Sequence, residues 1–242
     1  MRYSGSKARY VKDIVPIITK NLTTEKIYIE PFLGGGSIFS AIDHKNKIGS
    51  DINSKIIEMW KAFQSGLKPP SHVSEEEYYT MKEVALKGLK TYPEWILGYV
   101  SVACSYGSAP WNGYAKFNAK RNEDHIKEAY NGTIKQINDF KHFNDSKFIC
   151  RSYDEIPMVH NAIIYNDIPY EGTKGYKTGD FDFEKFWNWA RMMHENGNEV
   201  FVSSYNAPSD FKCVWRKKKH DGMGTTIEGK KQKIKIEKLY KL

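Results

Sequence analysis

Cysteine is scarce in this chain of 242 residues, and long apolar runs are absent from it. Its three cysteines, Cys104, Cys150 and Cys213, lie far apart, form no CxxC pair and have no histidine at metal-ligand spacing. This pattern predicts buried, small apolar side chains rather than disulfides or a zinc site, so we expect no metal. No apolar run is as long as a membrane span, and residues 1–7 lead into polar sequence without a signal-peptide core. We therefore expect a cytoplasmic protein.

Acidic residues are few at the C-terminal end of the chain. Residues 212–242 hold eleven Lys and Arg against three Asp and Glu, an excess of 8 that equals the formal net charge of +8 of the whole chain. The basic clusters at residues 216–219 (RKKK) and 229–235 (GKKQKIK) would attract a polyanion, nucleic acid first among the candidates, by releasing its counterions. A solubilising surface loop is the alternative that the charge pattern leaves open.

A P-loop for a nucleoside triphosphate is missing, because residues 4–7 (SGSK) lack the upstream glycine and strand. The pattern that follows predicts a strand, a loop, a helix and a strand, at residues 26–30 (KIYIE), 31–36 (PFLGGG), 37–44 and 47–50. Ser37 is the expected N-cap of the helix, and Asp51 follows the second strand. This order is typical of half of a nucleotide-binding α/β unit.

The three successive glycines of this loop, Gly34 to Gly36, allow a ligand to approach the backbone closely. The N-terminus of the helix expected after them would present free N–H groups that suit a phosphate or a carboxylate. Asp51 is placed to accept hydrogen bonds from ribose hydroxyls. The unit therefore predicts a ligand that carries a ribose.

The rest of the chain resumes the α/β pattern after an insertion. Apolar spacing predicts helices at residues 11–22 (with Pro16 inside), 76–89, 94–104, 124–140 and 183–195, and strands at residues 147–150, 161–165 and 199–203. Residues 105–122, rich in Gly, Asn and aromatic side chains, predict an exposed loop or hairpin. We expect an α/β fold in which residues 1–60 and 146–242 form a mostly parallel twisted sheet with helices on both faces. Residues 61–145 would form a mainly helical insert.

The stretch at residues 163–176 reads IIYNDIPYEGTKGY, in which an apolar, β-prone run ends at Asn166 and Asp167. Pro169 cannot donate to a strand ladder and pushes Ile168 towards an extended conformation, so the strand has to end here. A turn explains the end of the strand but not the carboxylate of Asp167 or the ring of Tyr170. On this stretch alone, a turn and an active site both remain open.

Taken in order, the motifs resemble those of the Dam-type DNA adenine-N6 methyltransferases, which use S-adenosylmethionine. Six segments carry the resemblance: an N-terminal cofactor motif at residues 2–14 (RYSGSKARYVKDI), the cofactor loop at 28–39 (YIEPFLGGGSIF), the ribose-binding acid at 50–53 (SDIN), a segment near the cofactor adenine at 148–156 (FICRSYDEI), the catalytic DPPY followed by threonine and tyrosine at 166–176, and the strand and turn after it at 200–208 (VFVSSYNAP). The insert between cofactor loop and catalytic motif is that of the family's alpha group. The resemblance implies a Rossmann-like methyltransferase fold.

It also implies the site residues. The cofactor-binding residues would be Tyr3, Ser6, Lys7, Glu30, Pro31, Phe32, Gly34, Gly35, Gly36, Ser37, Asp51, Asn53, Tyr153, Asp154 and Asp167. The catalytic residues would be Asp167, Ile168, Pro169 and Tyr170.

In this interpretation, Asp167 and the backbone carbonyl of Ile168 accept the two N6–H groups of adenine, so that the nitrogen lone pair points at the sulfonium methyl. Tyr170 would stack on a base that has left the duplex. The transfer is direct and needs no covalent nucleophile or metal. The chain departs from the family where Ile168 replaces the first proline of DPPY, which keeps the carbonyl but loses rigidity, so we expect retained but slower catalysis. Ser6 also stands where glycine is commoner.

Other acceptors are weighed on their chemistry. Methylation of cytosine C5 requires a thiolate, usually from a Pro-Cys pair, and the three cysteines here follow Ala103, Ile149 and Lys212. Methylation of cytosine N4 uses the same amine chemistry, although Asp rather than Ser at position 167 favours adenine. A catalytically weakened DNA-binding protein that retains the cofactor site, and an enzyme acting on RNA or a protein glutamine, also stay open.

The expected partner is double-stranded DNA, bound by a monomer or by a dimer near the nucleoid. The stretch at residues 113–118 (GYAKFN) resembles the family's loop containing GxFN, which lies near the target. The predicted DNA-binding residues combine amides, basic groups and rings: Trp111, Asn112, Tyr114, Lys116, Phe117, Asn118, Lys120, Arg121, Arg216, Lys217 and Lys218. A surface hairpin whose aromatic side chains simply pack is the alternative.

Overall fold

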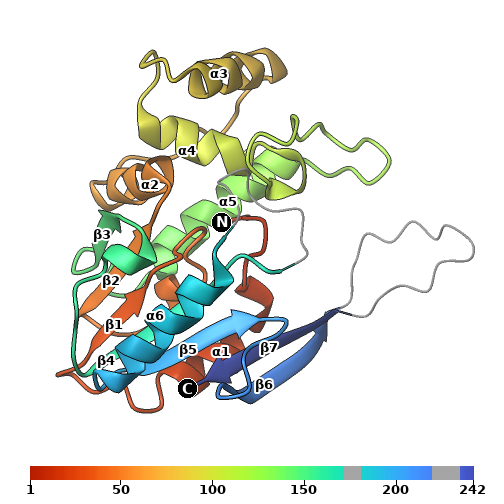
Figure 1. Cartoon of the computed structure of the whole chain (residues 1–242). Helices are drawn as coiled ribbons and strands as arrows, with labels where there is room; N and C mark the ends of the chain where they lie inside the picture. Colours follow the sequence, from red (N-terminus) through yellow and green to blue (C-terminus); the bar gives the residue numbers. More distant parts are fainter. Residues whose placement is uncertain (172–180, 220–234) are drawn as a thin grey trace, which may run out of the picture.

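A twisted sheet with five parallel strands forms the centre of this computed structural model, which describes residues 1–171, 181–219 and 235–242 (Figure 1). The strands are β1 (Ile27–Glu30), β2 (Lys47–Asp51), β3 (Lys147–Cys150), β4 (Ala162–Asp167), β5 (Glu199–Ser204), β6 (Lys212–Lys219) and β7 (Lys235–Lys241). They lie in the order β3-β2-β1-β4-β5-β7-β6, with β7 antiparallel to both β5 and β6. The mostly parallel α/β sheet predicted from the sequence is confirmed.

Six α-helices and four short 3₁₀-helices accompany the sheet in the described part of the chain. They are α1 (Val11–Ile18), α2 (Ser54–Gln64), α3 (Glu75–Lys87), α4 (Glu94–Ala103), α5 (His125–Asp139), α6 (Phe183–Glu195), η1 (Ala8–Tyr10), η2 (Phe39–Ala41), η3 (Tyr106–Ser108) and η4 (Tyr153–Glu155). Local signals fix several ends: Ser74 and Glu77 form a capping box before α3, and Gly88 ends it in the left-handed conformation at φ 67°. None of the described helices is long and apolar enough to cross a membrane.

Alternate side chains of the central strands enter two separate hydrophobic clusters. The side chains of Tyr28, Ile163 and Phe201 pack with α1. Ile29, the next residue of β1 after Tyr28, packs on the opposite face of the sheet. There Phe186 and Met193 of α6 cover the sheet. The alternation follows from the period of two in a strand, and it confirms helices on both faces (Figure 1).

The helix expected at residues 37–44 is wrong. Only η2 forms there, because Gly36 has φ 58° and Ile42 is already extended at φ −74° and ψ 118°, which leaves too few residues for α-helix nucleation. Two further helices differ from expectation. α1 ends at Ile18 rather than at residue 22, and just after its end the hydroxyl of Thr19 donates to the carbonyl of Val15. α2 was not predicted from the sequence.

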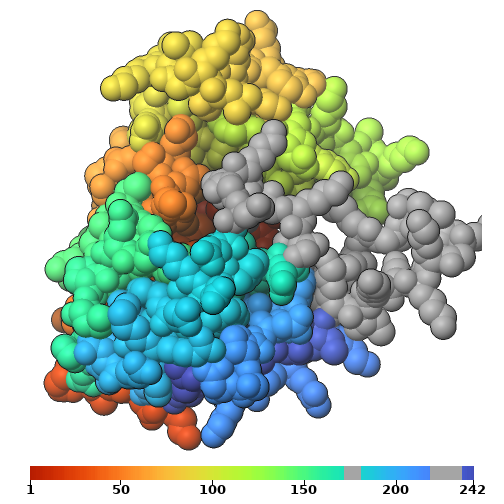
Figure 2. Space-filling view, viewed as in Figure 1, coloured from red at the N-terminus to blue at the C-terminus, as the bar shows by residue number. Residues whose placement is uncertain are grey.

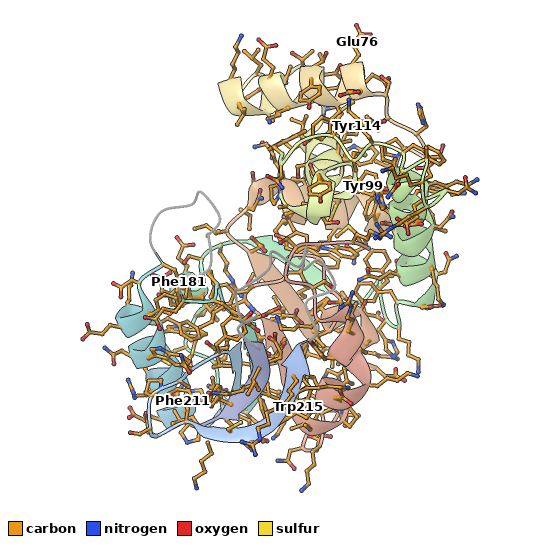
Figure 3. The ribbon with its side chains drawn as sticks, turned by 90° about the vertical axis from the view of Figure 1, so that its right-hand side faces the viewer. Glu76, Tyr99, Tyr114, Phe181, Phe211 and Trp215 are labelled. Carbon is orange, nitrogen blue, oxygen red and sulfur yellow. The ribbon has the colours of Figure 1, made fainter. Side chains whose placement is uncertain are left out.

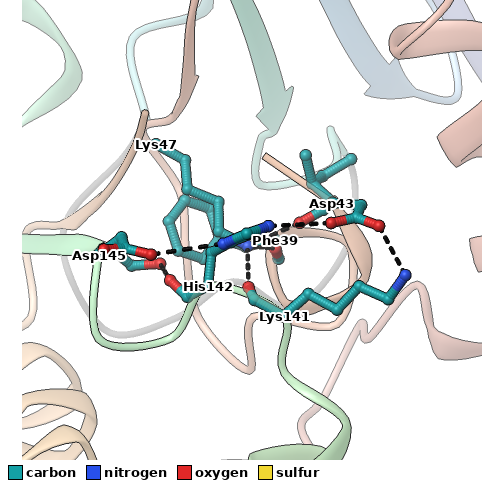
Figure 4. A network of polar contacts seen from close by, with 8 residues as sticks. Phe39, Asp43, Lys47, Lys141, His142 and Asp145 are labelled. Atoms are coloured by element: carbon teal, nitrogen blue, oxygen red, sulfur yellow. Dashed lines mark hydrogen bonds and ion pairs between the residues drawn. The ribbon is translucent and has the colours of Figure 1, made fainter. Parts of the chain in front are cut away.

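The buried ammonium of Lys47 donates hydrogen bonds to backbone carbonyls in the segment where the helix was expected. The ammonium Nζ of Lys47 donates to the carbonyls of Phe39 (3.1 Å), Ile42 (2.7 Å) and Lys141 (3.0 Å), and it lies 4.5 Å from the ring centre of Phe140 (Figure 4). One ammonium thus satisfies carbonyls at both ends of η2 and at the end of α5. These hydrogen bonds therefore connect β2, which begins at Lys47, to the segment that follows the glycine loop.

Two of the three cysteines are exposed, contrary to prediction. Cys104 is buried at the end of α4, but Cys150 and Cys213 lie on β3 and β6, the two edge strands, where side chains meet solvent. All three are free thiols.

The insert between β2 and β3 lies beyond the carboxyl ends of the parallel strands (Figures 1 and 2). Its predicted start at residue 61 falls within α2, and α4 packs tightly on that helix. A Cβ at Gly98 would lie only 2.2 Å from the carbonyl oxygen of Lys55, so only glycine permits this approach. The division into residues 1–60, 61–145 and 146–242 stays a prediction.

We expect the acid stability of the fold to depend on Glu199 at the start of β5. Burial alone would raise the pKa of Glu199, but hydrogen bonds from Lys241 (2.7 Å), Lys26 (2.8 Å) and Asn21 outweigh it and lower the pKa to about 2. Because this folded-state pKa lies below the unfolded value, the stabilisation is present above about pH 4.5 and is lost as the pH falls towards 2. Glu199→Gln should lower the free energy of unfolding at pH 7 by about 2 kcal/mol.

Urea unfolding of wild type and Glu199→Gln at pH 7, 5 and 3.5 tests this, with the exposed Glu195→Gln as the matched control. The difference between wild type and Glu199→Gln should narrow at pH 3.5. A difference that is constant with pH would contradict the assigned pKa.

Candidate active site

Three acidic side chains stand at the carboxyl ends of adjacent parallel strands. Glu30 ends β1, Asp51 ends β2 and Asp167 ends β4. Because β1 pairs in parallel with both β2 and β4, the three ends lie at one edge of the sheet. This edge, where the strand order places β1 between β2 and β4, is where open α/β sheets bind ligands.

Asp167 is anchored by a buried lysine from the N-terminal segment. The ammonium Nζ of Lys7 lies 2.6 Å from Oδ1 of Asp167, and only 5% of the Lys7 side chain and 22% of the Asp167 side chain are exposed. Burial would lower the pKa of Lys7, but the charges of Asp167 and Glu237 outweigh it and raise the pKa. Lys7 is therefore an ammonium, and it is paired with Asp167.

Tyr170 lies against the same lysine. Its ring centre is 4.8 Å from Nζ of Lys7, and its hydroxyl donates to the carboxylate of Glu237 on β7. The ring of Tyr205 meets it edge-on at 4.5 Å. Burial, with the charges of Asp167 and Glu237, raises the pKa of Tyr170 well above its usual value, so the hydroxyl stays protonated and can donate.

Ile168 turns its side chain into the core. Only 2% of it is exposed, among apolar residues of the face that α6 covers. A buried side chain restrains the backbone at this position, which offsets part of the rigidity that a proline ring would supply.

The glycine loop is packed by aromatic side chains. A Cβ at Gly35 would lie 2.6 Å from Cβ of Tyr3, and one at Gly36 would lie 2.9 Å from the ring of Trp60. The indole N–H of Trp60 donates to the carbonyl of Gly34 at 3.0 Å. Glycine at these positions thus allows Tyr3 and Trp60 to pack closely against the loop. The expected α-helix, whose N-terminus would have presented free amides to a ligand, does not follow the loop.

The carboxylate of Asp51 holds the glycine loop in place through a hydrogen bond to its backbone. Its Oδ2 accepts the amide of Gly34 and its Oδ1 accepts the amide of Asn53, both at 2.9 Å. Burial raises the pKa of Asp51, and the two amide hydrogen bonds oppose the rise. Asn53 in turn caps α2 by accepting from the amide of Lys55 at 3.2 Å. Asp51 is therefore held in one orientation beside the loop.

Glu30 is a buried acid rather than an open carboxylate. Its Oε2 accepts from the hydroxyl of Tyr28 at 3.0 Å. Burial raises the pKa of Glu30 well above its usual value, in spite of that hydrogen bond, and the charge of Asp167 adds to the rise. Burial therefore favours the neutral form of Glu30.

The segment after β3 brings further predicted residues to the same edge. The ring of Tyr153 stacks on that of Phe32, with centres 5.6 Å apart. Asp154 forms an ion pair with Lys185 at 2.6 Å, whose hydrogen bond lowers the pKa of Asp154. Ser6 donates to the hydroxyl of Ser37 at 3.1 Å, which joins the N-terminal motif to the glycine loop.

The family model of the D12 class N6 adenine-specific DNA methyltransferases matches residues 3–211. The chain belongs to this family. The resemblance noted in the sequence is thereby confirmed, and β6 and β7 lie beyond the matched region.

Two curated relatives of this D12-class chain carry related names. Modification methylase StsI of Streptococcus sanguinis is 26% identical over 211 residues, which cover 79% of this chain and 32% of StsI. The retron Ec67 DNA adenine methylase of Escherichia coli is 22% identical over 223 residues, which cover 84% of this chain and 76% of that enzyme. The chain thus spans about a third of StsI. The crystal structure of SMU.472 complexed with SAH covers 99% of this chain and 53% of its own, with 12% identity and a TM-score of 0.36, a likeness too weak to characterise fold or site.

The aromatic residues predicted to bind DNA in this D12-class chain pack within the insert. Tyr114 lies in the insert (Figure 3), and its hydroxyl donates to the carbonyl of Val73 at 2.7 Å. The rings of Tyr114 and Trp111 both lie against that of Tyr78. Phe117, by contrast, is 57% exposed. Packing within the insert is enough to explain why aromatic side chains stand at positions 111 and 114. Contacts of Trp111 and Tyr114 with DNA therefore stay a prediction.

The polar residues of the predicted DNA-binding set are mostly at the surface. Lys116 pairs with Glu75 at 3.0 Å, Asn112 donates to the carbonyl of Tyr106 at 3.3 Å, and Lys217 pairs with Asp13 at 2.7 Å. The exposed members are Asn112, Lys116, Lys120, Arg121, Arg216, Lys217 and Lys218. Asn118 is half-buried, and its backbone amide donates to the carbonyl of Glu123 at 2.9 Å. Most of the basic cluster at residues 229–235, and residues 172–176 of the catalytic stretch, lie outside the described residues.

Sequence reasoning missed Glu237 in this D12-class chain. It is the one acid among residues 229–242, and no local pattern links it to Lys7 or Tyr170. Only the antiparallel return of β7 beside β5 brings it to the site.

Proposed function

We propose that this protein transfers a methyl group from S-adenosylmethionine to the N6 amine of a flipped-out adenine in double-stranded DNA. The observation that carries the proposal is the ion pair of Asp167 with buried Lys7, at the sheet edge that Asp51 also shares. Tyr170 completes this group as an aromatic ring beside the charged acceptor. Membership of the D12 class supports adenine N6 as the atom methylated.

The residues at this edge fit S-adenosylmethionine by their chemistry. Asp51 is partly exposed, and each of its oxygens can accept a further hydrogen bond beyond its one amide, as ribose hydroxyls require. Ile52 beside it is 67% exposed, an apolar surface that an adenine ring would cover. When bound, S-adenosylmethionine would supply an electrophilic methyl group on its sulfonium and would leave as S-adenosylhomocysteine, while the methylated amine would release one proton. The other cofactor residues expected from the resemblance belong to this proposal.

Asp167 acts on the acceptor nitrogen. A carboxylate can accept about four hydrogen bonds, so the ion pair with Lys7 is compatible with an N6–H donor. The backbone carbonyl of Ile168 accepts the second N6–H, held by the buried side chain of that residue. Two fixed acceptors draw the nitrogen towards tetrahedral geometry and offset the positive charge that develops on it.

DNA would be held by basic and aromatic groups at the surface. Arg216 and Lys218 are exposed on β6, and Phe117 is exposed in the insert. Basic side chains contact phosphates, and an exposed ring can stack on bases that have left the duplex. The insert is proposed to read the target sequence.

The test is methyl transfer from labelled S-adenosylmethionine to mixed-sequence duplex DNA, followed by nucleoside mass analysis. We expect N6-methyladenine in the product. N4-methylcytosine would reassign the base, and labelling of RNA but not of duplex DNA would reassign the substrate. Binding of cofactor without any product would leave a DNA-binding protein with a disabled site.

A further inference from the structure

Glu237 is a buried carboxylate inside the proposed site but outside the region that the family model matches. It lies on β7, whereas the match ends at residue 211. Only 3% of its side chain is exposed. A buried charge of this kind is costly unless it is paired.

Glu237 contacts two members of the proposed catalytic group, Tyr170 and Lys7. The hydroxyl of Tyr170 donates to Oε1 of Glu237, and Nζ of Lys7 lies 3.5 Å from the same oxygen. Lys7 also lies 2.6 Å from Asp167. The ammonium of Lys7 is therefore shared between the carboxyl groups of Asp167 and Glu237.

The hairpin of β6 and β7 also holds the N-terminal segment that supplies Lys7. Trp215 meets the ring of Tyr10 edge-on at 5.4 Å, and Lys217 pairs with Asp13 at 2.7 Å. Lys217 stands directly opposite Glu237 in the register of the two strands. Contacts from both strands thus fix the position of Lys7 relative to Asp167.

We propose that Glu237 is a positioning residue for methyl transfer, which orients the Tyr170 ring through its hydroxyl and holds Lys7 between two carboxylates. The proposal rests on the function proposed above. The fixed ring sets the plane in which the flipped base stacks, and Lys7, held between two carboxyl groups, keeps Asp167 in place as an acceptor where positive charge develops on N6. Glu237 itself does not touch the base.

Three variants separate these two effects. Glu237→Gln keeps an acceptor for the Tyr170 hydroxyl but removes the charge, Glu237→Leu removes both, and Tyr170→Phe removes only the hydroxyl. Single-turnover methyl transfer at saturating cofactor gives the rate, and separate titrations give the Kd for S-adenosylmethionine. Asp210→Asn is the matched control, because it removes a carboxylate that pairs with Arg191 at 2.7 Å and contacts neither Lys7 nor Tyr170.

We expect Glu237→Gln and Tyr170→Phe each to slow transfer about 10-fold, and Glu237→Leu about 100-fold, with little change in cofactor Kd. The double variant Tyr170→Phe with Glu237→Leu should be no slower than Glu237→Leu alone, because the two groups act through one contact. Asp210→Asn should keep the wild-type rate. A role only in folding would instead shift the unfolding midpoint and leave the rate of the folded fraction unchanged.

Wild-type rates in folded Glu237→Gln and Tyr170→Phe would overturn the inference, and so would additive losses in the double variant. If Glu237→Leu does not fold, the other two variants decide. A wild-type protein that methylates no adenine would instead refute the proposed function, so the two failures are distinguishable.

Discussion

Asp167→Asn should slow methyl transfer by about 10³-fold, because it replaces a charged acceptor with a neutral amide at the reacting nitrogen. The amide has almost the same shape, so the core around Ile168 should stay packed. The substitution also removes the nearer partner of Lys7, which lies 2.6 Å away. Single-turnover transfer to duplex DNA at saturating S-adenosylmethionine measures the effect.

Asp210→Asn is the matched control. Asp210 pairs with Arg191 at 2.7 Å, at the surface beyond α6 and away from the proposed site, so its loss should leave the rate unchanged. A folded Asp167→Asn protein that transfers methyl groups within about 10-fold of wild type would contradict the role given to Asp167.

Lys47→Met should lower the free energy of unfolding by about 3 kcal/mol. Methionine fills much of the volume of the lysine stem but leaves the carbonyls of Phe39, Ile42 and Lys141 without their shared donor, and each unsatisfied buried group costs about 1–3 kcal/mol. Burial lowers the pKa of Lys47 to about 8, so urea unfolding at pH 7 measures the ammonium form. The variant should also bind cofactor more weakly, because η2 follows the glycine loop directly.

Lys45→Met serves as the comparison, since it makes the same change on an exposed neighbour and should alter stability by no more than about 0.5 kcal/mol. Equal effects of the two substitutions would show that the carbonyls around Lys47 find other partners.

Short-range patterns predicted the five parallel strands and the proposed catalytic carboxylate. β1 and β2 were expected within one residue of their bounds, and Asp167 was expected at the end of its strand, because alternation and the position of Pro169 are local features. α2 was missed although its signal was present. Helical spacing is visible in Ile56, Trp60 and Phe63, and Asn53 before them is a good N-cap. The predicted domain boundary between residues 60 and 61 divides this helix.

Other features depend on contacts between distant parts of the chain. The helix expected after Gly36 does not form, partly because Lys47 supplies donors that helix amides would otherwise provide. The basic residues of β6 indicated a surface charge but not a strand, and Glu237 reached the site only through its pairing with β5 and β6. Such pairings leave no periodicity in the residues themselves.

The continuous hydrophobic cluster on one face of the sheet has a consequence for how this protein could change its target. That cluster runs from Tyr28 and Ile163 of the sheet through Trp60 of α2 to Tyr99 of α4 and Tyr78 of α3. An insert that is proposed to read the target, and that shares one hydrophobic core with the sheet, could not be exchanged as a separate unit. New sequence preferences would arise more readily from single substitutions at exposed positions such as Phe117 than from transplanting a whole segment between lineages.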